Sequence, residues 1–556
     1  MRFLDRTREL LPARDDLRAI VSHPRHDLLA GFTVAIVALP LALGFGISSG
    51  LGAAAGLTTA VIAGALAAFF GGSSLQVTGP TGAMTVVLVP IMHTYGATGV
   101  LTVGLMAGVI LLGLAFARAG QYVAYIPASV IEGFTLGIAL VIGLQQLPAA
   151  LGVAPPGADQ VVALAAQAIG SFAAHPNWTA LAVTLAVAIA ILVGGRLAPV
   201  IPFSLFAVVV ATLVAELTGL DVDRIGTLPA GLPIPSLAFF DPAQIWVLTG
   251  PAIAVAALAA LESLLSAAVA DGMGVNSRHD PDRELFGQGL ANLITPLFGG
   301  VPATGAIART AVNVRAGASS RLAALAHAAV LALIVYTAAP LAGRIPLAAL
   351  AGVLLATAIR MVEVGSVRAM ARASRSEAVI LTVTAIATLA LDLVKAVILG
   401  LVVAGALALR AVTASSRLRQ MPLHPDLPED HTDEERALLD EHIVVYRIEG
   451  PLVFAAHRFL LELSEVARVE VVVLRLSSVT AMDASGALVL KDTIEKLEHR
   501  HMVVLVSGIR PGHHRILDAL EIIAALGAKG RVFATTPEAI EAARNHLHHT
   551  GLVPRG

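Results

Sequence analysis

Two short stretches of this chain begin alike, although they lie far apart in its apolar part. One reads Gly79-Pro80-Thr81-Gly82-Ala83, and the other reads Val301-Pro302-Ala303-Thr304-Gly305-Ala306. Both place a Thr-Gly-Ala triplet just after a proline, and each follows a Gly-Gly pair, at 71–72 and at 299–300. Matching short segments that Gly and Pro interrupt, one in each half of a membrane protein, indicate the midplane binding site of a transporter.

The chemistry of these stretches suits an anion. Proline near a helix start is tolerated because its missing N–H group would be unpaired there anyway. Glycine lets a ligand approach the backbone, and the free N–H groups of a first turn carry roughly half a positive charge. Two such helix ends that face each other would form an anion site. The alternative is that these residues only permit close helix packing. The preceding stretch at 74–78 is short and polar, which favours extended backbone buried in protein.

The composition changes near residue 420. The 556 residues are 56% apolar and 14% charged, with a net charge of −2. Residues 1–420 are 10% charged, whereas residues 421–556 are 25% charged, as soluble proteins usually are. The first part is therefore predicted to lie in a membrane, which excludes a wholly soluble enzyme. The small net charge argues against nucleic-acid binding, and the absence of cysteine excludes disulfides and thiolate metal sites.

Apolar runs predict fourteen membrane segments, because a spanning helix needs about 20 largely apolar residues. Three of the runs, at 79–92, 286–298 and 304–314, are short or broken by Gly and Pro. The longer runs lie near 30–50, 53–70, 98–117, 125–147, 178–194, 202–219, 246–270, 322–342, 345–359, 378–391 and 393–410. Thr81 and Thr304 lie 223 residues apart. With seven segments in each half, the two halves would be inverted in the membrane.

The charges of the loops predict the orientation. With fourteen crossings, the loops on the side of both termini hold 19 basic residues, and the opposite loops hold three. Basic residues concentrate in cytoplasmic loops. We therefore expect a multi-pass protein of the bacterial inner (plasma) membrane with both termini in the cytoplasm. The charged N-terminus lacks the apolar core of a secretory signal.

The soluble end of the chain predicts a small α/β domain. Strand-like runs at 443–448, 470–476 and 502–506 alternate with helical patterns at 455–467, 485–500, 513–526 and 537–548. Alternating strands and helices imply a largely parallel sheet. Asp483 stands just before a helical pattern and is a candidate N-cap. The expected domains are a cytoplasmic segment (1–27), a membrane transport domain (28–415), a linker (416–441), the α/β domain (442–549) and a remnant of a protease recognition site (550–556).

Two charged side chains lie inside apolar runs. Glu262 stands in the run 256–266, and a carboxylate in a membrane costs at least a few kcal/mol and usually has a function. Burial disfavours its charged form, so it could take up a proton. With the hydroxyl of Ser266, four residues on and on the same helical face, it could instead hold sodium. Arg309 could add positive charge to the anion site, or it could extend to the interface or pair with Glu262. The charged loop from 271 to 284 is expected to be a structural turn on the cytoplasmic side.

These residues resemble the sulfate permease (SulP) family, whose usual cytoplasmic tail is a STAS domain. The resemblance covers nearly the whole chain in order. It rests on Pro40 to Phe45, Val77 to Pro80, Leu261 to Leu265, Ala270 to Met273, Arg278-His279, Gly287 to Asn292, Gly299 to Thr310, and, for the STAS domain, Met482 to Gly486. It implies an all-α polytopic membrane domain that consists of two inverted repeats of seven segments, with half-helices, and a cytoplasmic α/β STAS domain. It also implies a core that moves against a gate, and a homodimer.

The resemblance also implies site residues. The anion would lie between the third and tenth segments near the first, lined by Phe45, Thr81, Gly82, Ala83, Gly305, Ala306, Ile307 and Arg309. Glu262 falls at the acidic position used for cation coupling, and Ser266 matches a hydroxyl of sodium-coupled bicarbonate members. Those members carry Thr where this chain has Ile307, which favours protons over sodium. Leu41 replaces a frequent Gln, which leaves the substrate open. Ser485 matches a serine that can be phosphorylated in related domains, although a plain helix start is the better explanation for it.

The sequence therefore predicts a secondary active anion transporter without a cofactor or metal, and not an enzyme. We expect proton-coupled symport of a C4-dicarboxylate such as fumarate, of bicarbonate or of sulfate, by alternating access. The alternatives are a sodium-coupled bicarbonate symporter, an uncoupled anion channel, exchanger or voltage-responsive motor, and a membrane-anchored signalling protein. The expected partners are the anion, the lipid bilayer, a second copy of the chain and a regulatory partner at the STAS domain.

Overall fold

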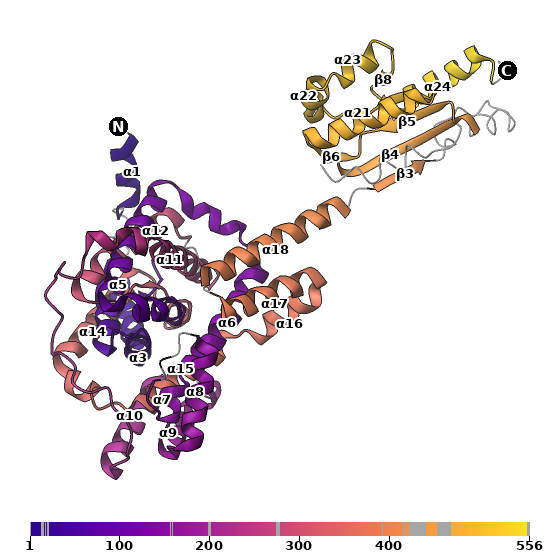
Figure 1. Cartoon of the computed structure of the whole chain (residues 1–556). Helices are drawn as coiled ribbons and strands as arrows, with labels where there is room; N and C mark the ends of the chain where they lie inside the picture. Colours follow the sequence, from indigo (N-terminus) through magenta and orange to yellow (C-terminus); the bar gives the residue numbers. More distant parts are fainter. Residues whose placement is uncertain are drawn as a thin grey trace. The chain divides into compact units, whose positions relative to one another are not determined.

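Figure 1 shows the computed structural model of the chain. It describes residues 2–12, 16, 18, 20, 22–155, 157, 160–197, 202–273, 278–391, 393–414, 417–421, 441–452 and 469–552. The helical pattern expected at 455–467, most of the expected linker and residues 553–556 lie outside these ranges. Contacts within the chain divide it into two compact units, Met1–Ala404 and Gly405–Gly556.

Helices make up the apolar part of the chain. They are α1 (Arg2–Leu10), α3 (Pro24–Ser48), α4 (Ala53–Phe70), α5 (Gly82–Phe116), α6 (Ala128–Gln145), α7 (Leu147–Leu151), α8 (Val161–Ala174), α9 (Trp178–Leu197), α10 (Phe203–Thr218), α11 (Ile245–Met273), α12 (Pro281–Ile294), α13 (Ile307–Arg315), α14 (Arg321–Ala342), α15 (Leu347–Met361), α16 (Val364–Ala373), α17 (Arg375–Ala390) and α18 (Leu393–Ala414). Short 3-10 turns lie at Ala119–Tyr125, Pro242–Gln244 and Thr295–Phe298.

Each of the fourteen apolar runs coincides with helix in this structure. The runs at 79–92 and 98–117 join into α5, which bends at Gly96, where φ is 67°. Within the described residues, eight helical stretches are long and apolar enough to cross a membrane. Helix α8 was not expected, because its 14 residues are too few to span a bilayer.

By their contacts, the helices of the first unit form two bundles. The first contains α3, α4, α5, α11, α12, α13 and α14, and the second contains α6, α7, α8, α9, α10, α15, α16 and α17. Small residues allow close packing in the first bundle: a Cβ atom at Gly56 would collide with the backbone of Ala42 and Gly46 on α3. Helices α6, α10 and α15 of the second bundle contact α5 and α3 of the first.

The second unit is an α/β domain, as predicted. Its strands are β3 (Arg417–Met421), β4 (Ile443–Leu452), β5 (Val471–Arg475), β6 (Val479–Met482), β7 (Val503–Ser507) and β8 (Val532–Phe533), and its helices are α21 (Ala484–His499), α22 (Pro511–Ala519), α23 (Ile522–Gly527) and α24 (Thr536–Thr550). The sheet order is β3-β4-β5-β7-β8, with β6 beside β4, and only β3 runs antiparallel to its neighbour.

Both faces of this sheet are covered. Val472 and Leu474 belong to the core on one side, and Val471 and Val473 belong to the core on the other side, where α24 packs. A run that is buried on both faces reads as continuously apolar, which is why β5 was recognisable in the sequence. The Asp483 carboxylate accepts the Gly486 N–H at 2.7 Å and caps α21, as expected. Strand β3 falls in the range expected to be a linker.

Candidate functional site

The two matching stretches meet through a short sheet. Strands β1 (Thr78–Gly79) and β2 (Thr304–Gly305) pair antiparallel, with Thr78 opposite Gly305 and Gly79 opposite Thr304. Antiparallel pairing suits two stretches that run in opposite directions, as those of an inverted repeat do. Two residues separate β1 from α5, and one residue separates β2 from α13. The pairing therefore brings together the first turns of two helices, whose N–H groups have no acceptor within the helix.

Glu262 on α11 joins the two stretches. Its Oε2 accepts the hydroxyl of Thr81 at 2.9 Å and the hydroxyl of Thr304 at 2.7 Å. The two hydroxyl oxygens are themselves 3.1 Å apart. Thr81 also caps α5, because its hydroxyl accepts the Met84 N–H. Sequence reasoning placed Thr81 and Glu262 in the site but omitted Thr304, although Thr304 occupies the equivalent position of the second triplet.

Other hydroxyls of this region bind the backbone of the repeat. Ser263 accepts the Gly305 N–H at 2.8 Å, so α11 also holds β2 through its backbone. The Ser266 hydroxyl lies 3.0 Å from that of Thr310, which accepts the Val77 N–H. Ser266 is fully buried. It lies one helical turn from Glu262 along α11, but in this structure its hydroxyl contacts Thr310.

Arg309, in the first turn of α13, reaches back to the first stretch. It is 2% exposed, and its Nη2 donates to the Pro80 carbonyl at 2.8 Å. Nη1 lies against Gly79, where a Cβ atom would stand 2.6 Å away, and it has no hydrogen-bond partner within the described part of the chain. No ion pair joins Arg309 to Glu262 among the described residues, so the structure gives this guanidinium a role at the strand junction.

The remaining predicted site residues surround the first turns of the two helices. Phe45 is buried on α3, and both its ring and the side chain of Ile142 on α6 lie against Gly82, where a Cβ atom would collide with Ile142. Ala83 and Ala306 are buried, and the Ala306 N–H donates to the Val77 carbonyl at 2.9 Å. Ile307 is 37% exposed. Ile142 was not predicted, since nothing in an apolar helix distinguishes it.

A buried polar cluster beside the site was also missed. Glu284 was assigned to a structural turn, but it lies in α12 and is 1% exposed. Its carboxylate accepts the N–H groups of Gly72 and Ser73 and the side-chain amides of Gln76 and Gln288. Gln288 also donates to the Thr78 hydroxyl of β1. The spacing of Glu284 and Gln288, four residues apart on one helical face, was the available signal.

The arrangement can bind a small anion but shows no site for a metal. Two helix starts, together with the Arg309 guanidinium, place positive charge at one point inside the apolar part of the chain. The carboxylate beside them can be charged or neutral. Over the ranges the structure covers, no group of three or more His, Asp or Glu side chains could hold a metal ion.

Comparison with known families gives two matches. Residues 25–384 match the model of the sulfate permease family, and residues 437–539 match that of the STAS domain. The chain is 34% identical to YvdB of Bacillus subtilis, over 87% of this chain and 91% of that protein. It is 32% identical to the bicarbonate transporter BicA of Picosynechococcus, over 90% of this chain and 91% of that protein.

Solved structures agree with the fold. The transmembrane domain of a cyanobacterial bicarbonate transporter BicA is 33% identical, with a TM-score of 0.62 over 68% of this chain and 98% of that chain. The inward-facing murine anion transporter Slc26a9 is 18% identical, with a TM-score of 0.83 over 97% of this chain and 94% of that chain. At that identity the likeness describes the fold of both units.

Proposed function

The chain belongs to the sulfate permease family of membrane transporters, and we propose that it is a secondary active transporter that carries one small anion together with a proton. The anion binds where α5 and α13 begin, and Glu262 carries the proton. The protein lies in the inner membrane as a homodimer, with both termini in the cytoplasm and the STAS domain open to a regulatory partner.

The contacts of Glu262 carry this proposal. Glu262 Oε2 and the hydroxyls of Thr81 and Thr304 form a triangle with sides of 2.7, 2.9 and 3.1 Å. Each hydroxyl brings one proton, so an ionised carboxylate leaves two protons for three contacts. A protonated Glu262 supplies the third, and every side of the triangle can then be a hydrogen bond. The geometry thus suits a carboxyl group that is neutral in one step of the cycle.

Charge explains how the proton and the anion would be coupled. An ionised Glu262 places a negative charge beside the helix starts that would hold the anion, and two like charges at close range repel each other in a low-dielectric site. Protonation removes this repulsion. The anion therefore binds best to the protonated site, and the proton binds best to the site that holds the anion. By linkage, each ligand raises the affinity for the other. Such reciprocal binding is the requirement for symport.

The candidate anions are a C4-dicarboxylate such as fumarate, bicarbonate and sulfate. The family description and the bicarbonate transporter BicA, 32% identical, support the last two. Sodium-coupled bicarbonate transport is the second candidate function, because the same relative is a bicarbonate transporter. Ser266, one turn from Glu262 on α11, also has its hydroxyl 3.0 Å from that of Thr310. The exposed Ile307 offers no oxygen to a cation, which favours the proton.

Uptake into proteoliposomes tests the proposal. Radiolabelled fumarate, sulfate and bicarbonate are offered separately to the purified protein, with an inward proton gradient and no sodium, and then with sodium and no proton gradient. We expect accumulation of one anion above its external concentration, and we expect a protonophore to abolish it.

Two results would reject the proposed coupling. Accumulation that needs sodium and survives the protonophore would establish the sodium symporter. Fast flux that only equilibrates the anion, with a large ohmic current, would establish a channel.

A further inference from the structure

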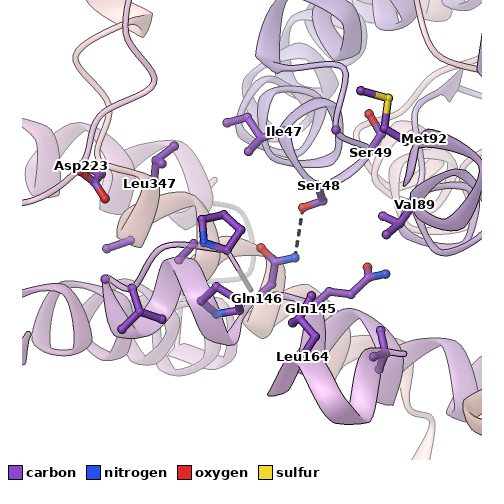
Figure 2. Close-up of a pocket in the computed structure, with 18 of the residues that line it drawn as sticks. Ile47, Ser48, Ser49, Val89, Met92, Gln145, Gln146, Leu164, Asp223 and Leu347 are labelled. Carbon is purple, nitrogen blue, oxygen red and sulfur yellow. Dashed lines mark hydrogen bonds between the residues drawn. The ribbon is translucent and has the colours of Figure 1, made fainter. Parts of the chain in front are cut away.

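A cavity lies at the ends of several helices, apart from the predicted anion site. Its volume is about 330 Å³. It is bounded by the C-terminal ends of α3 and α6, by α5 before the bend at Gly96, and by the beginnings of α8 and α15. Figure 2 shows the amides of Gln145 and Gln146 and the hydroxyl of Ser48 facing its interior, with Asp223 beside Leu347 at the opposite end from Val89.

The two bundles meet at this cavity. Ser48 ends α3, which belongs to the first bundle, and Gln146 directly follows α6, which belongs to the second. The Gln146 Nε2 donates to the Ser48 Oγ at 3.1 Å (Figure 2). Gln146 is 5% exposed. A polar bond between two apolar bundles is therefore shielded from solvent on most sides, and its loss would leave buried polar groups unpaired.

Helices α3 and α6 link the cavity to the predicted anion site. Phe45 precedes Ser48 by three residues on α3, and Ile142 precedes Gln146 by four residues beside α6, so each pair shares one helical face. Phe45 and Ile142 both lie against Gly82 at the start of α5. Two layers of side chains therefore separate the first turn of α5 from the cavity. The inner layer is apolar, and the outer layer is the bond between Ser48 and Gln146.

We infer that this cavity is the outer vestibule of the transport route and that the hydrogen bond between Ser48 and Gln146 is the latch that holds its inner end closed. The inference rests on the proposed transport function. An anion that enters from the side opposite the N-terminus first meets neutral hydrogen-bond donors, the Gln145 and Gln146 amides and the Ser48 hydroxyl. It reaches the helix starts only after Ser48 separates from Gln146 and the side chains of Phe45 and Ile142 move away from Gly82.

Because the chain contains no cysteine, an introduced thiol is the single site of modification. Val89→Cys places a single thiol in the cavity and keeps the bond between Ser48 and Gln146. Its rate of modification by a membrane-impermeant methanethiosulfonate is measured in oriented proteoliposomes of the full chain. We expect modification from the outer side only. Adding Gln146→Leu removes the donor while keeping a similar volume, and we expect it to raise the modification rate at least about fivefold, as a bond worth about 1 kcal/mol allows. Gln145→Leu is the matched control, because Gln145 lines the same cavity and does not bond Ser48.

A cross-link tests the movement itself. Ser48→Cys with Gln146→Cys is joined by a short bis-methanethiosulfonate, and mass spectrometry measures the joined fraction. We expect joined protein to lose the anion transport that the same double variant shows before treatment, and we expect reduction to restore it. Joined protein that transports at the control rate would overturn the latch.

The accessibility measurement decides the matter independently of any substrate. Modification of Val89→Cys from the cytoplasmic side, or a rate that Gln146→Leu leaves unchanged, would overturn the inference even if no cross-link forms. If no anion is transported but Gln146→Leu still raises the rate, the proposed function fails and the vestibule stands.

Discussion

The hydroxyl oxygens of Thr81 and Thr304 lie 3.1 Å apart, although 223 residues separate them in the chain. They are the equivalent threonines of the two matching triplets, and the same carboxylate oxygen of Glu262 contacts both. The pseudo-symmetric axis of the repeat therefore passes close to a single ionisable group. A change in the charge of Glu262 acts on the starts of α5 and α13 at once, which is why the first predictions concern these three residues.

Glu262→Gln should uncouple transport from the proton gradient. The amide keeps the shape of a neutral carboxyl group but can neither release nor take up a proton. With one coupled proton, a gradient of about two pH units supports roughly a hundredfold accumulation, since each unit is 1.36 kcal/mol. We expect the variant to show no accumulation and to retain exchange of labelled for unlabelled anion.

A carboxylate elsewhere in the apolar part serves as the control for that variant. Glu132 on α6 accepts the Ser366 hydroxyl at 2.7 Å, away from the helix starts, and Glu132→Gln should leave accumulation unchanged. Proton-driven accumulation by Glu262→Gln at the native level would remove Glu262 from the coupling.

Removing either threonine hydroxyl should weaken the site in the same way. Thr81→Val and Thr304→Val each take one hydrogen-bond donor from Glu262, which costs about 1 to 3 kcal/mol for a buried group. We expect a higher KM for the anion and a shifted pH profile of uptake in both. Thr81→Ser and Thr304→Ser keep the hydroxyl and should stay near native values. Because the three groups act as one unit, the double valine variant should lose less than the sum of the single losses; strict additivity would mean that the hydroxyls act independently.

The sequence predicts the fold well where one physical rule dominates. Apolar runs had to be helical because unpaired backbone groups are not tolerated in lipid, and every one of the fourteen coincides with helix. In the last part of the chain, strand-like runs that alternate with helical patterns predicted the strands β4, β5 and β7. Helix α8 and the strands β3, β6 and β8 were missed because they are short, and in short elements the packing of neighbours decides the structure rather than the local pattern.

The site was predicted in outline but not in its contacts. The triplets identified Thr81 to Ala83 and Gly305 to Ala306, since Gly and Pro in a broken apolar run are unusual. That Thr304 meets Glu262, and that Arg309 bonds the Pro80 carbonyl rather than Glu262, depends on the register of β1 with β2. Register is a tertiary property that residue spacing along one chain cannot give, and the same holds for Ile142 against Gly82.

Arg309 should contribute to anion affinity through both its charge and its shape. Nη2 is committed to the Pro80 carbonyl, while Nη1 has no partner in the part of the chain that the structure describes. Hydrogen bonds to charged groups contribute about 1.5 to 3 kcal/mol, so Arg309→Gln should raise the KM for the anion roughly tenfold or more. Arg309→Lys keeps the charge but loses the planar fork and should recover part of the affinity. Equal KM values for all three proteins would contradict a role in binding.

Glu284 should be needed for stability rather than for transport chemistry. Its carboxylate accepts four hydrogen bonds in a buried place, two from backbone and two from amides. In Glu284→Gln, the new side-chain NH₂ group faces hydrogen-bond donors and cannot accept from them. Each buried donor that loses its acceptor costs about 1 to 3 kcal/mol of stability. We expect Glu284→Gln in detergent to melt several degrees below the native protein, as measured by light scattering during heating. Glu363→Gln, at an exposed position before α16, is the control, and an unchanged melting temperature in Glu284→Gln would mean that the cluster adapts.

His513 should make the α/β unit less stable in acid. It lies in the first turn of α22 at 8% exposure, and its Nδ1 has no hydrogen-bond partner among the residues described. Burial lowers the pKa of His513, and the charges of Arg510 and His514 lower it further. The folded unit therefore binds fewer protons than the unfolded chain, whose histidine titrates near pH 6.5. Stability contributed by neutral His513 is present above that pH and is lost as the pH falls below it.

Hydrogen exchange of the segment 511–527, corrected for its intrinsic pH dependence, tests this prediction. Below about pH 6.5 the segment should open more readily in the native protein than in His513→Gln. His499→Gln, at an exposed position at the end of α21, should keep the native pH dependence, and an identical dependence in all three proteins would assign the acid sensitivity to another group.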